Sequence, residues 1–458
     1  MKKILFTLAS ALLTFGFGFS QTTEIPDLNF EQALIDLGYD SGDPDGFVLT
    51  TNINLISELN VIAKSITDLT GIEGFTDLTR LYCSGNQLTR LDVSNNTALT
   101  YLSCGNNQLT SLDVSNNTAL TNLYCSTNQL TSLDVSNNTA LTNLFFYYNQ
   151  LTSLDVSNNT ALTNLSCGTN QLTSLDVSNN TALTYLHCYG NQLTSLDVSN
   201  NTALIKIGSY SNELTSLDVS NNTALTDLSV VDNKLTSLDV SNNTALTDLS
   251  VGNNKLTSLD VSNNTALIKI GSYSNELTSL DVSNNTALTD LSVVDNQLTS
   301  LDVSNNTALT SLDCYYNELT SLDVRNGNNI NFTYFKSIYN PNLTCIFVDG
   351  VDWSSENWTG FIDSASTFVA NEAECSALSV VDYASYLDIF IHPNPTENHL
   401  FVQGHKNPIS ISISNLQGKK VLSKINVDKI DVSELSNGVY FIKISDGINS
   451  STKKFIKN

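Results

Sequence analysis

The feature that most constrains this chain is a repeat with a strict period of 21 residues. The nonamer LDVSNNTAL occurs eleven times, beginning at Leu91 and then at every twenty-first residue up to Leu301. A unit this short cannot bury its apolar residues alone, so successive units have to stack and share one core. The sequence therefore predicts a solenoid with twelve repeats that begin at residue 78.

Each repeat contains two apolar half-repeats, and each half-repeat predicts one short strand. The first half has the pattern L-x-x-L-x-C/V/S-x-x-N, as in Leu99, Leu102 and Cys104, and the second has L-x-x-L-x-V-x-x-N, as in Leu112 and Val114. Alternate residues of a strand point to opposite sides, so these residues face the core and the residues between them face solvent. The pattern resembles the nested 21-residue leucine-rich repeats (IRREKO type) of bacterial surface proteins. The expected fold class is an all-β-rich solenoid, a leucine-rich repeat stack with two strands per 21-residue coil, followed by a small C-terminal β-sandwich.

The first 20 residues are typical of a secretory signal peptide. A basic start is followed by an apolar stretch and by small residues before Gln21. The apolar stretch of ~16 residues is shorter than the ~20 residues that a membrane-spanning helix needs. We therefore expect an exported protein, secreted or on the outer cell surface, with no membrane span in the mature chain.

Non-repeating segments on both sides of the repeats predict caps, because an open end of the stack would expose its core. The N-terminal cap is expected over residues 21–55, and the solenoid over 56–330 with an irregular first coil. The C-terminal cap is expected over residues 331–378. A short helix in the N-terminal cap should carry four apolar residues on one face: Phe30, Ala33, Leu34 and Leu37.

A linker over residues 379–386 should lead to a separate domain over 387–458. Alternating apolar runs between turn residues predict five to seven strands of a small β-sandwich in this domain. Three motifs follow one another: Pro393-Asn394-Pro395-Thr396, the turn Asn415–Lys419 and Gly438–Lys443. They resemble the type A C-terminal sorting domain of the type IX secretion system of Bacteroidota. The resemblance implies a type IX secretion machinery as partner, removal of the domain, and release or attachment at the cell surface.

The cysteines belong to two groups. Cys345 and Cys375 lie outside the repeats, and in an exported protein we expect them to form a disulfide. The others share one inward position of the repeat, which Phe146, Val230 and Ser209 occupy in other copies. This exchange indicates a small or apolar core residue rather than a metal or redox ladder. These cysteines are Cys83, Cys104, Cys125, Cys167, Cys188 and Cys314.

The chain is strongly acidic, with 20 Lys and Arg against 45 Asp and Glu and a formal net charge of −25. That charge excludes nucleic acids and anionic membrane surfaces as partners. Part of it comes from an aspartate column at an outward position of the second half-repeat, from Asp92 at every twenty-first residue to Asp323. Diffuse screening by solvent cations and discrete Ca²⁺ binding are both open for this column, although no Ca²⁺-binding loop of convincing spacing occurs. The sequence assigns no metal and no cofactor.

The outward positions of the first half-repeat vary between copies, whereas those of the second half-repeat, such as Ser111, Asp113 and Ser115, barely change. Copies that share a scaffold and differ on one surface indicate that this surface makes contacts, and tyrosine is a good contact residue. The alternative is aromatic stacking that only supports the sheet. We expect the best contact surface between Arg80 and Tyr210. The candidate ligand-binding residues, called the aromatic strip below, are Tyr101, Tyr124, Phe145, Tyr147, Tyr148, Tyr185, His187, Tyr189 and Tyr210.

The sequence does not predict an enzyme. His187 is the one histidine outside the predicted sorting domain, and no Ser or Cys is arranged with it as a nucleophile. A phosphate-binding loop, an HExxH motif and zinc-ligand spacing are all missing from the sequence. The chain resembles internalin-like surface proteins, which implies protein binding or adhesion. A glycan ligand for the tyrosines and a passive surface spacer are the alternative interpretations.

Overall fold

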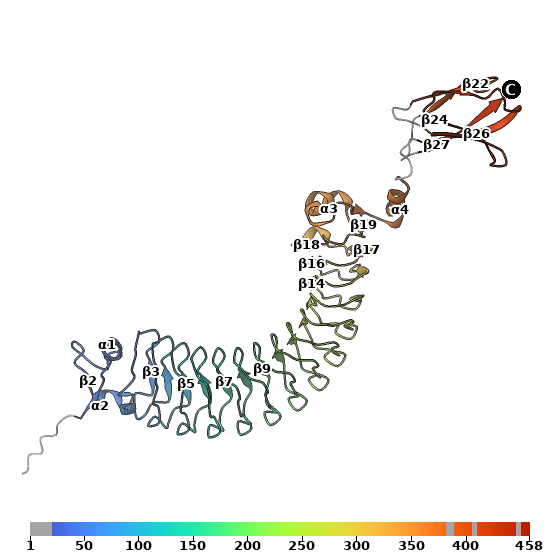
Figure 1. Ribbon diagram of the computed structural model, residues 1–458. Helices are drawn as coiled ribbons and strands as arrows, with labels where there is room; N and C mark the ends of the chain where they lie inside the picture. Colours follow the sequence, from blue (N-terminus) through green and yellow to red (C-terminus); the bar gives the residue numbers. More distant parts are fainter. Residues whose placement is uncertain (1–20, 382–388, 405–409, 446–449) are drawn as a thin grey trace, which may run out of the picture. The chain divides into compact units, whose positions relative to one another are not determined.

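The structure used here is a computed structural model of the chain, which describes residues 21–381, 389–404, 410–445 and 450–458. The predicted signal peptide, residues 1–20, lies outside the described residues, as does most of the predicted linker. The chain divides into two compact units, Met1–Ala370 and Asn371–Asn458. The first unit contains the repeats and the second contains a small β-sandwich (Figure 1).

Within the described residues, a parallel sheet of 14 strands, called the main sheet below, runs through the first unit. One strand comes from each coil, and the register places equivalent residues side by side, so that Leu102 of one coil pairs with Leu123 of the next. The coils follow one another along a curved stack (Figure 1). This architecture confirms the predicted leucine-rich repeat solenoid. The strands are β3 (Glu58–Asn60), β4 (Arg80–Tyr82), β5 (Tyr101–Ser103), β6 (Asn122–Tyr124), β7 (Asn143–Phe145), β8 (Asn164–Ser166), β9 (Tyr185–His187), β10 (Lys206–Gly208), β11 (Asp227–Ser229), β12 (Asp248–Ser250), β13 (Lys269–Gly271), β14 (Asp290–Ser292), β16 (Ser311–Asp313) and β18 (Tyr334–Lys336).

Each of these short strands buries its central residue and leaves its two flanking residues facing outward. In β5, Leu102 is fully buried, whereas Tyr101 and Ser103 are partly exposed. Burial of one leucine side chain stabilises the fold by roughly 1.5–3 kcal/mol, and every coil adds several such residues to the same columns. A register slip of one residue would turn all of these leucines toward solvent, so the apolar columns determine which residues face outward.

The second half-repeat forms a hydrogen-bonded strand in only part of the stack. Ladder strands occur there at β15 (Ser300–Asp302) and β17 (Ser321–Asp323), and an isolated bridge joins Asp92 to Asp113. In the other described coils this segment turns locally, and a serine donates its backbone N–H to the aspartate two residues before it, as Ser157 does to Asp155 at 2.9 Å. The predicted second strand of each coil is therefore mostly replaced by an Asp–Ser turn.

Two columns of buried asparagines connect the coils. In the first column, Asn149 donates from Nδ2 to the carbonyl oxygens of Cys125 and Phe146 at 3.1 and 2.9 Å, and its Oδ1 accepts from the N–H of Leu130. In the second column, Asn180 donates to the carbonyl oxygens of Val156 and Asn159. Asparagine amides of both columns thus donate to carbonyl oxygens of the preceding coil and add side-chain hydrogen bonds to the contacts between coils.

The N-terminal cap consists of the antiparallel pair β1 (Thr22–Glu24) and β2 (Phe47–Leu49) with the helices α1 (Leu28–Asp36) and α2 (Thr50–Ile53). Asp27 caps α1 by accepting the N–H groups of Asn29 and Phe30. Phe30, Ala33 and Leu34 of α1 are buried, and the Phe30 ring stacks on Phe75 of the first coil, which contains the 3-10 helix η1 (Ile72–Gly74). Leu37, which we expected on the same face, lies beyond the end of α1 and is 40% exposed.

The stack continues beyond residue 330, where the sequence predicted a cap. The main sheet ends with β18, and a second parallel sheet has the order β15, β17, β19 (Cys345–Phe347) and β20 (Thr367–Val369). Trp358 of α3 (Val351–Trp358) stacks on Phe335 at 4.2 Å and closes this end of the core. Two short 3-10 helices, η2 (Asn329–Asn331) and η3 (Thr359–Phe361), complete the region.

The second unit begins with α4 (Glu372–Val381) and continues as two antiparallel sheets that enclose a separate apolar core. The seven strands agree with the predicted β-sandwich. Cys345 in the first unit and Cys375 in the second are disulfide-bonded cysteines. None of the helices among the described residues is long and apolar enough to cross a membrane. The sheets contain β21 (Phe390–His392), β22 (His399–Gln403) and β25 (Lys429–Asp431), and β23 (Ser410–Asn415), β24 (Lys420–Ile425), β26 (Gly438–Ser445) and β27 (Ser450–Lys457).

Candidate binding surface

The aromatic strip lies on the outward face of the main sheet. Its members come from β5, β6, β7 and β9 and from the residues that directly follow β7, β9 and β10. The repeat places them there, because the parallel register aligns the outward positions of successive coils at the spacing of neighbouring strands, ~4.8 Å. All nine predicted residues are partly or well exposed, and they form two rows rather than one continuous strip.

The first row runs across four coils. The ring centroids of Tyr82 and Tyr101 are 4.8 Å apart, and those of Tyr101 and Tyr124 are 5.2 Å apart. Tyr124 then meets Phe145 edge to face at 5.1 Å. Each of these rings is held by its neighbours, so the row presents a preformed aromatic surface with little side-chain freedom left to lose.

The second row lies at β9 and β10. Tyr189 and Tyr210 are stacked with centroids 4.6 Å apart and planes 6° apart. The Tyr189 ring lies over Gly168, where a Cβ atom would stand only 2.4 Å from the ring. Glycine at this position therefore makes room for Tyr189. In the intervening coil the outward residues are Asn164, Ser166 and Gly168, so the two rows are separated by a polar and small-residue gap.

Tyr148 occupies an unusual backbone position. Its φ is 56°, in the left-handed region, at the turn that follows the inward column, and its side chain is 52% exposed. The same turn position is held by Asn106 in one coil and by Ser211 in another. A bulky residue costs roughly 1–2 kcal/mol there relative to an unstrained conformation. Tyr148 contacts the Tyr147 ring edge to face at 5.8 Å and does not fill the core.

His187 is neutral at pH 7 in this surface. Burial lowers its pKa, and the nearby Lys206 ammonium lowers it further. The His187 Nδ1 and the Tyr185 hydroxyl share a hydrogen bond of 2.8 Å. Beside them is a cavity of about 330 Å³, which is also lined by Lys206 and Asp227, an ion pair at 3.1 Å. This end of the strip therefore combines aromatic area with hydrogen-bonding groups and one paired cation.

The sequence reasoning missed aromatic residues at both ends of the sheet. Tyr82 begins the first row and occupies the same repeat position as Tyr124, which was the signal that could have identified it. Tyr334 and Tyr339 lie beyond the last regular repeat. There the register pairs Leu312 with Phe335, a shift of 23 rather than 21 residues, so the periodicity no longer indicated their outward positions.

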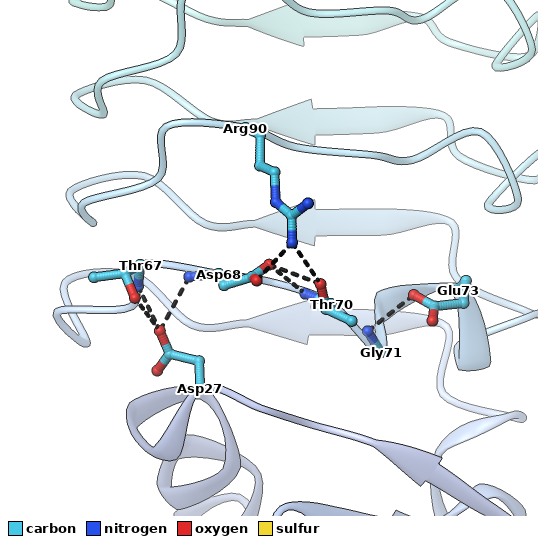
Figure 2. A network of polar contacts seen from close by, with 7 residues as sticks. All are labelled: Asp27, Thr67, Asp68, Thr70, Gly71, Glu73 and Arg90. Carbon is cyan, nitrogen blue, oxygen red and sulfur yellow. Dashed lines mark hydrogen bonds and ion pairs between the residues drawn. The ribbon is translucent and has the colours of Figure 1, made fainter.

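The cap-proximal end of the repeats contains a polar network (Figure 2). Arg90 replaces the serine of the other repeats and donates to Asp68 at 2.8 Å and to Thr70 at 3.2 Å. Burial alone would raise the pKa of Asp68, but the hydrogen bonds from Arg90 and Thr70 lower it. Asp27 accepts from the N–H and the hydroxyl of Thr67. A cavity of about 450 Å³ lies here, yet these groups pair with one another, so the network serves to join the cap to the first coils.

The aspartate column lies on the second half-repeat and is exposed to solvent. Hydrogen bonds from Ser115 lower the pKa of Asp113, and the same contact lowers the pKa of equivalent aspartates such as Asp134 and Asp218. Within the part of the chain that the structure describes, no group of three or more His, Cys, Asp or Glu side chains is placed to hold a metal ion. The hydrogen bonds of the column are those of local turns.

The six cysteines of the repeats are free thiols and fully buried. Burial raises the pKa of Cys104 and Cys188 to about 12, so these thiols remain protonated. Phe146, Val230 and Ser209 are buried at the equivalent positions. The column therefore consists of core residues of varied chemistry.

Comparisons with known proteins identify relatives of both units. The secretion system C-terminal sorting domain family matches residues 390–458, and the LVIVD repeat family matches residues 184–212 and 249–275. A search of curated proteins found no match.

Among solved structures, the functional domain of InlJ from Listeria monocytogenes, described as including a cysteine ladder, is 30% identical with a TM-score of 0.67. The alignment covers 96% of this chain and 99% of that chain. The internalin inlF of L. monocytogenes is 26% identical, with a TM-score of 0.54, over 62% of this chain and 94% of that chain. The leucine-rich repeat protein LIC12759 of Leptospira interrogans shares the fold, with 21% identity and a TM-score of 0.60 over 72% of this chain and 95% of that chain.

Proposed function

This chain belongs to the internalin-like leucine-rich repeat proteins and carries a secretion system sorting domain, and from that premise we propose that it binds a protein partner through the aromatic strip. The sorting domain indicates export by type IX secretion. The strip then faces the outside of the cell or the medium, where it mediates adhesion or another protein contact.

The observation that carries the proposal is the pair of stacked aromatic rows on one face of an otherwise uniform scaffold. Rings held by neighbouring rings, such as Tyr189 against Tyr210, lose little conformational entropy when a partner covers them. Tyrosine adds a hydroxyl at the edge of each apolar ring, and burial raises the pKa of Tyr189 to about 12, so its hydroxyl stays a hydrogen-bond donor.

The other outward face supports the same assignment by contrast. Its residues change little between coils, and they form internal Asp–Ser turns, as Asp155 does with Ser157 and Asp176 with Ser178. The similar solved structures include two internalins of L. monocytogenes, InlJ and inlF. Most differences between coils lie on the main-sheet face, so this face is the one best suited to recognise one partner.

The test is affinity capture from extracts of cell surfaces with the purified protein, compared with two variants. In one variant Tyr147, Tyr148, Tyr185, Tyr189 and Tyr210 are changed to Ser; in the other the same residues are changed to Phe. We expect the wild type to retain a protein, the Ser variant to lose it, and the Phe variant to retain it in part, because the rings remain and the hydroxyls do not.

A control variant with Asp155, Asp176 and Asp197 changed to Asn alters the opposite half-repeat and should bind as the wild type does. Equal capture by the wild type and the Ser variant would show that the strip is not the binding surface. Release of the captured material by free sugars would favour a glycan ligand. If no variant, the wild type included, retains anything from protein or glycan fractions, the protein is a spacer.

A further inference from the structure

A second group of aromatic side chains lies near the other end of the main sheet, beyond the aromatic strip. Tyr315 and Tyr316 follow β16, and Tyr339 follows β18. The Tyr316 and Tyr339 rings are stacked with centroids 4.5 Å apart and planes 9° apart, and Tyr315 meets Tyr316 edge to face at 4.4 Å. Tyr316 is 47% exposed and Tyr339 is 50% exposed.

The fold does not require these rings. Tyr316 and Tyr339 have φ values of 55° and 62°, at the turn position where bulky residues are strained. Ser211 and Ser274 form the same turn in other coils with φ values of 55° and 49°. Exposed aromatic residues at strained positions that a serine can occupy are retained for contacts with another molecule rather than for packing.

The charge around the group indicates what kind of molecule it contacts. The Lys336 ammonium lies 3.8 Å from the centroid of the Tyr315 ring, so a cation already occupies one ring face of this group. Asp313 accepts from the N–H of Tyr315 and from the Tyr334 hydroxyl. Asp295 directly precedes Tyr316 in the turn column, where its N–H donates to the carbonyl oxygen of Tyr315.

The neighbouring outward positions of the sheet continue this acidic character. Asp227 and Asp248 are paired in register, and Asp290 stands at the equivalent position two coils further on. Lys269 is the intervening residue, so carboxylates outnumber ammonium groups along this half of the face. A partner that covers Tyr316 and Tyr339 therefore meets carboxylates on the side toward the middle of the sheet.

We propose that Tyr315, Tyr316 and Tyr339 form a second contact site, which binds a Lys- or Arg-rich segment of a partner protein. The cationic side chains lie over the exposed faces of Tyr316 and Tyr339, and Asp295 and Asp313 pair with them. The site shares no residue with the aromatic strip, so it goes beyond the proposed function and can be tested separately from it.

The experiment measures binding of a fluorescein-labelled peptide of alternating Lys and Gly to the purified protein by fluorescence anisotropy. A peptide of alternating Gln and Gly serves as the uncharged probe. The measurements are made at about 0.15 M ionic strength, where salt screens the interaction between charges that are more than ~8 Å apart. We expect the Lys peptide to bind and the variant with Tyr316→Ser and Tyr339→Ser to bind it about tenfold more weakly. Both changes introduce a residue that other coils carry at this turn, so we expect the variant to fold.

A charge-matched pair of variants separates the site from general attraction to an acidic protein. Asp295→Asn with Asp313→Asn should weaken binding of the Lys peptide about fivefold, whereas Asp281→Asn with Asp302→Asn, on the second half-repeats, should change it less than about twofold. Equal effects of the two pairs, unchanged binding by the Tyr variant, equal binding of the Gln peptide, or no binding by the wild type would each overturn the proposal. The variant of the aromatic strip described above should still bind the Lys peptide, and the Tyr316, Tyr339 variant should still capture the partner of the strip. The two proposals can thus fail independently.

Discussion

At the scale of single residues, the coils depend on asparagine side chains as much as on leucines. Leucine burial is non-directional, so it favours stacking without determining how the backbones of adjacent coils are hydrogen-bonded. The buried asparagines supply that direction, because their amides donate to carbonyls of the preceding coil, as Asn149 does to Cys125 and Asn180 does to Val156. Removal of one amide therefore removes two hydrogen bonds to buried carbonyls of the stack.

Asn180→Ala is therefore expected to lower the free energy of unfolding by about 1–3 kcal/mol, because two buried hydrogen bonds are lost. The Asn180 amide donates to the carbonyl oxygens of Val156 and Asn159 at 3.0 and 2.9 Å, and both acceptors are buried. Urea unfolding followed by circular dichroism measures the change. The adjacent Asn179 is exposed and donates to Ser157 at 3.3 Å, so Asn179→Ala should cost less than about 0.5 kcal/mol. Similar losses for the two variants would contradict a structural role of the buried column.

At the scale of elements, the two halves of each coil are held together differently. The first half pairs in a regular parallel ladder, whereas in most coils the second half is a local turn in which the aspartate accepts an N–H group of its own coil. The turn depends on the ionised carboxylate, which is the better hydrogen-bond acceptor. The stability of this side of the stack therefore depends on pH.

Hydrogen bonds from serine lower the pKa of Asp113 and its equivalents below their ordinary value of 3.8. A carboxyl group whose pKa is lower in the folded state contributes stability above its unfolded pKa and loses it as the pH falls through the folded pKa. We expect the melting temperature to fall as the pH is lowered from neutral to below 3.8. A variant with Asp113, Asp155 and Asp197 changed to Asn should show a smaller decrease. A melting temperature that rises on acidification would instead show that repulsion along the column dominates.

The cysteine column and the cap cysteines should differ in reactivity. The six repeat thiols are fully buried and their pKa values are raised by burial, so we expect no alkylation of them by iodoacetamide at pH 8 until the protein is unfolded. Peptide mapping without reduction should yield Cys345 linked to Cys375, the pairing that we propose. Rapid alkylation of Cys104 or Cys188 in the native protein would show that the stack opens locally.

At the scale of the whole molecule, the solenoid is extensible, because each coil contacts mainly its neighbours. The chain itself contains an extension: Leu204–Asn233 recurs unchanged as Leu267–Asn296. The copied coils carry the acidic half of the main-sheet face, between the aromatic strip and the second contact site. Their number changes the distance between these two surfaces, and of the aromatic residues of either surface the copied coils carry Tyr210 alone, whose equivalent is Tyr273.

Deletion of residues 204–266 joins Ala203 to Leu267 and leaves the 21-residue period uninterrupted. We expect a folded protein whose stack is shorter by three strand spacings, about 14 Å, because strands lie ~4.8 Å apart. Small-angle scattering measures the shortening, and circular dichroism checks the fold. Capture of the partner of the aromatic strip should weaken only modestly, since Tyr210 alone is lost from the strip and its equivalent Tyr273 takes the same place. An unfolded product would contradict the independence of the coils.

Much of the fold could be predicted from the chain alone because its regularities are local. The period of 21 residues, the alternation of inward and outward positions and the motifs of the sorting domain are all short-range patterns. Where the pattern changes, prediction failed: Leu37 lies past the end of its helix, and Tyr339 lies after the register shift of 23 residues between Leu312 and Phe335. Arg90 interrupts the repeat because it pairs with Asp68, 22 residues earlier.

By itself, the sequence determined the stacking of the coils and the side on which each residue lies, because the burial of regularly spaced leucines permits one register. Only the tertiary structure decided where the second half-repeat forms a ladder, since that depends on whether a backbone N–H such as that of Val303 reaches a carbonyl oxygen of the next coil, here that of Asp323. The structure also decided how the aromatic rings pack, for example that the Tyr189 ring lies over Gly168. Such contacts between adjacent coils depend on side-chain volume and not on the 21-residue period.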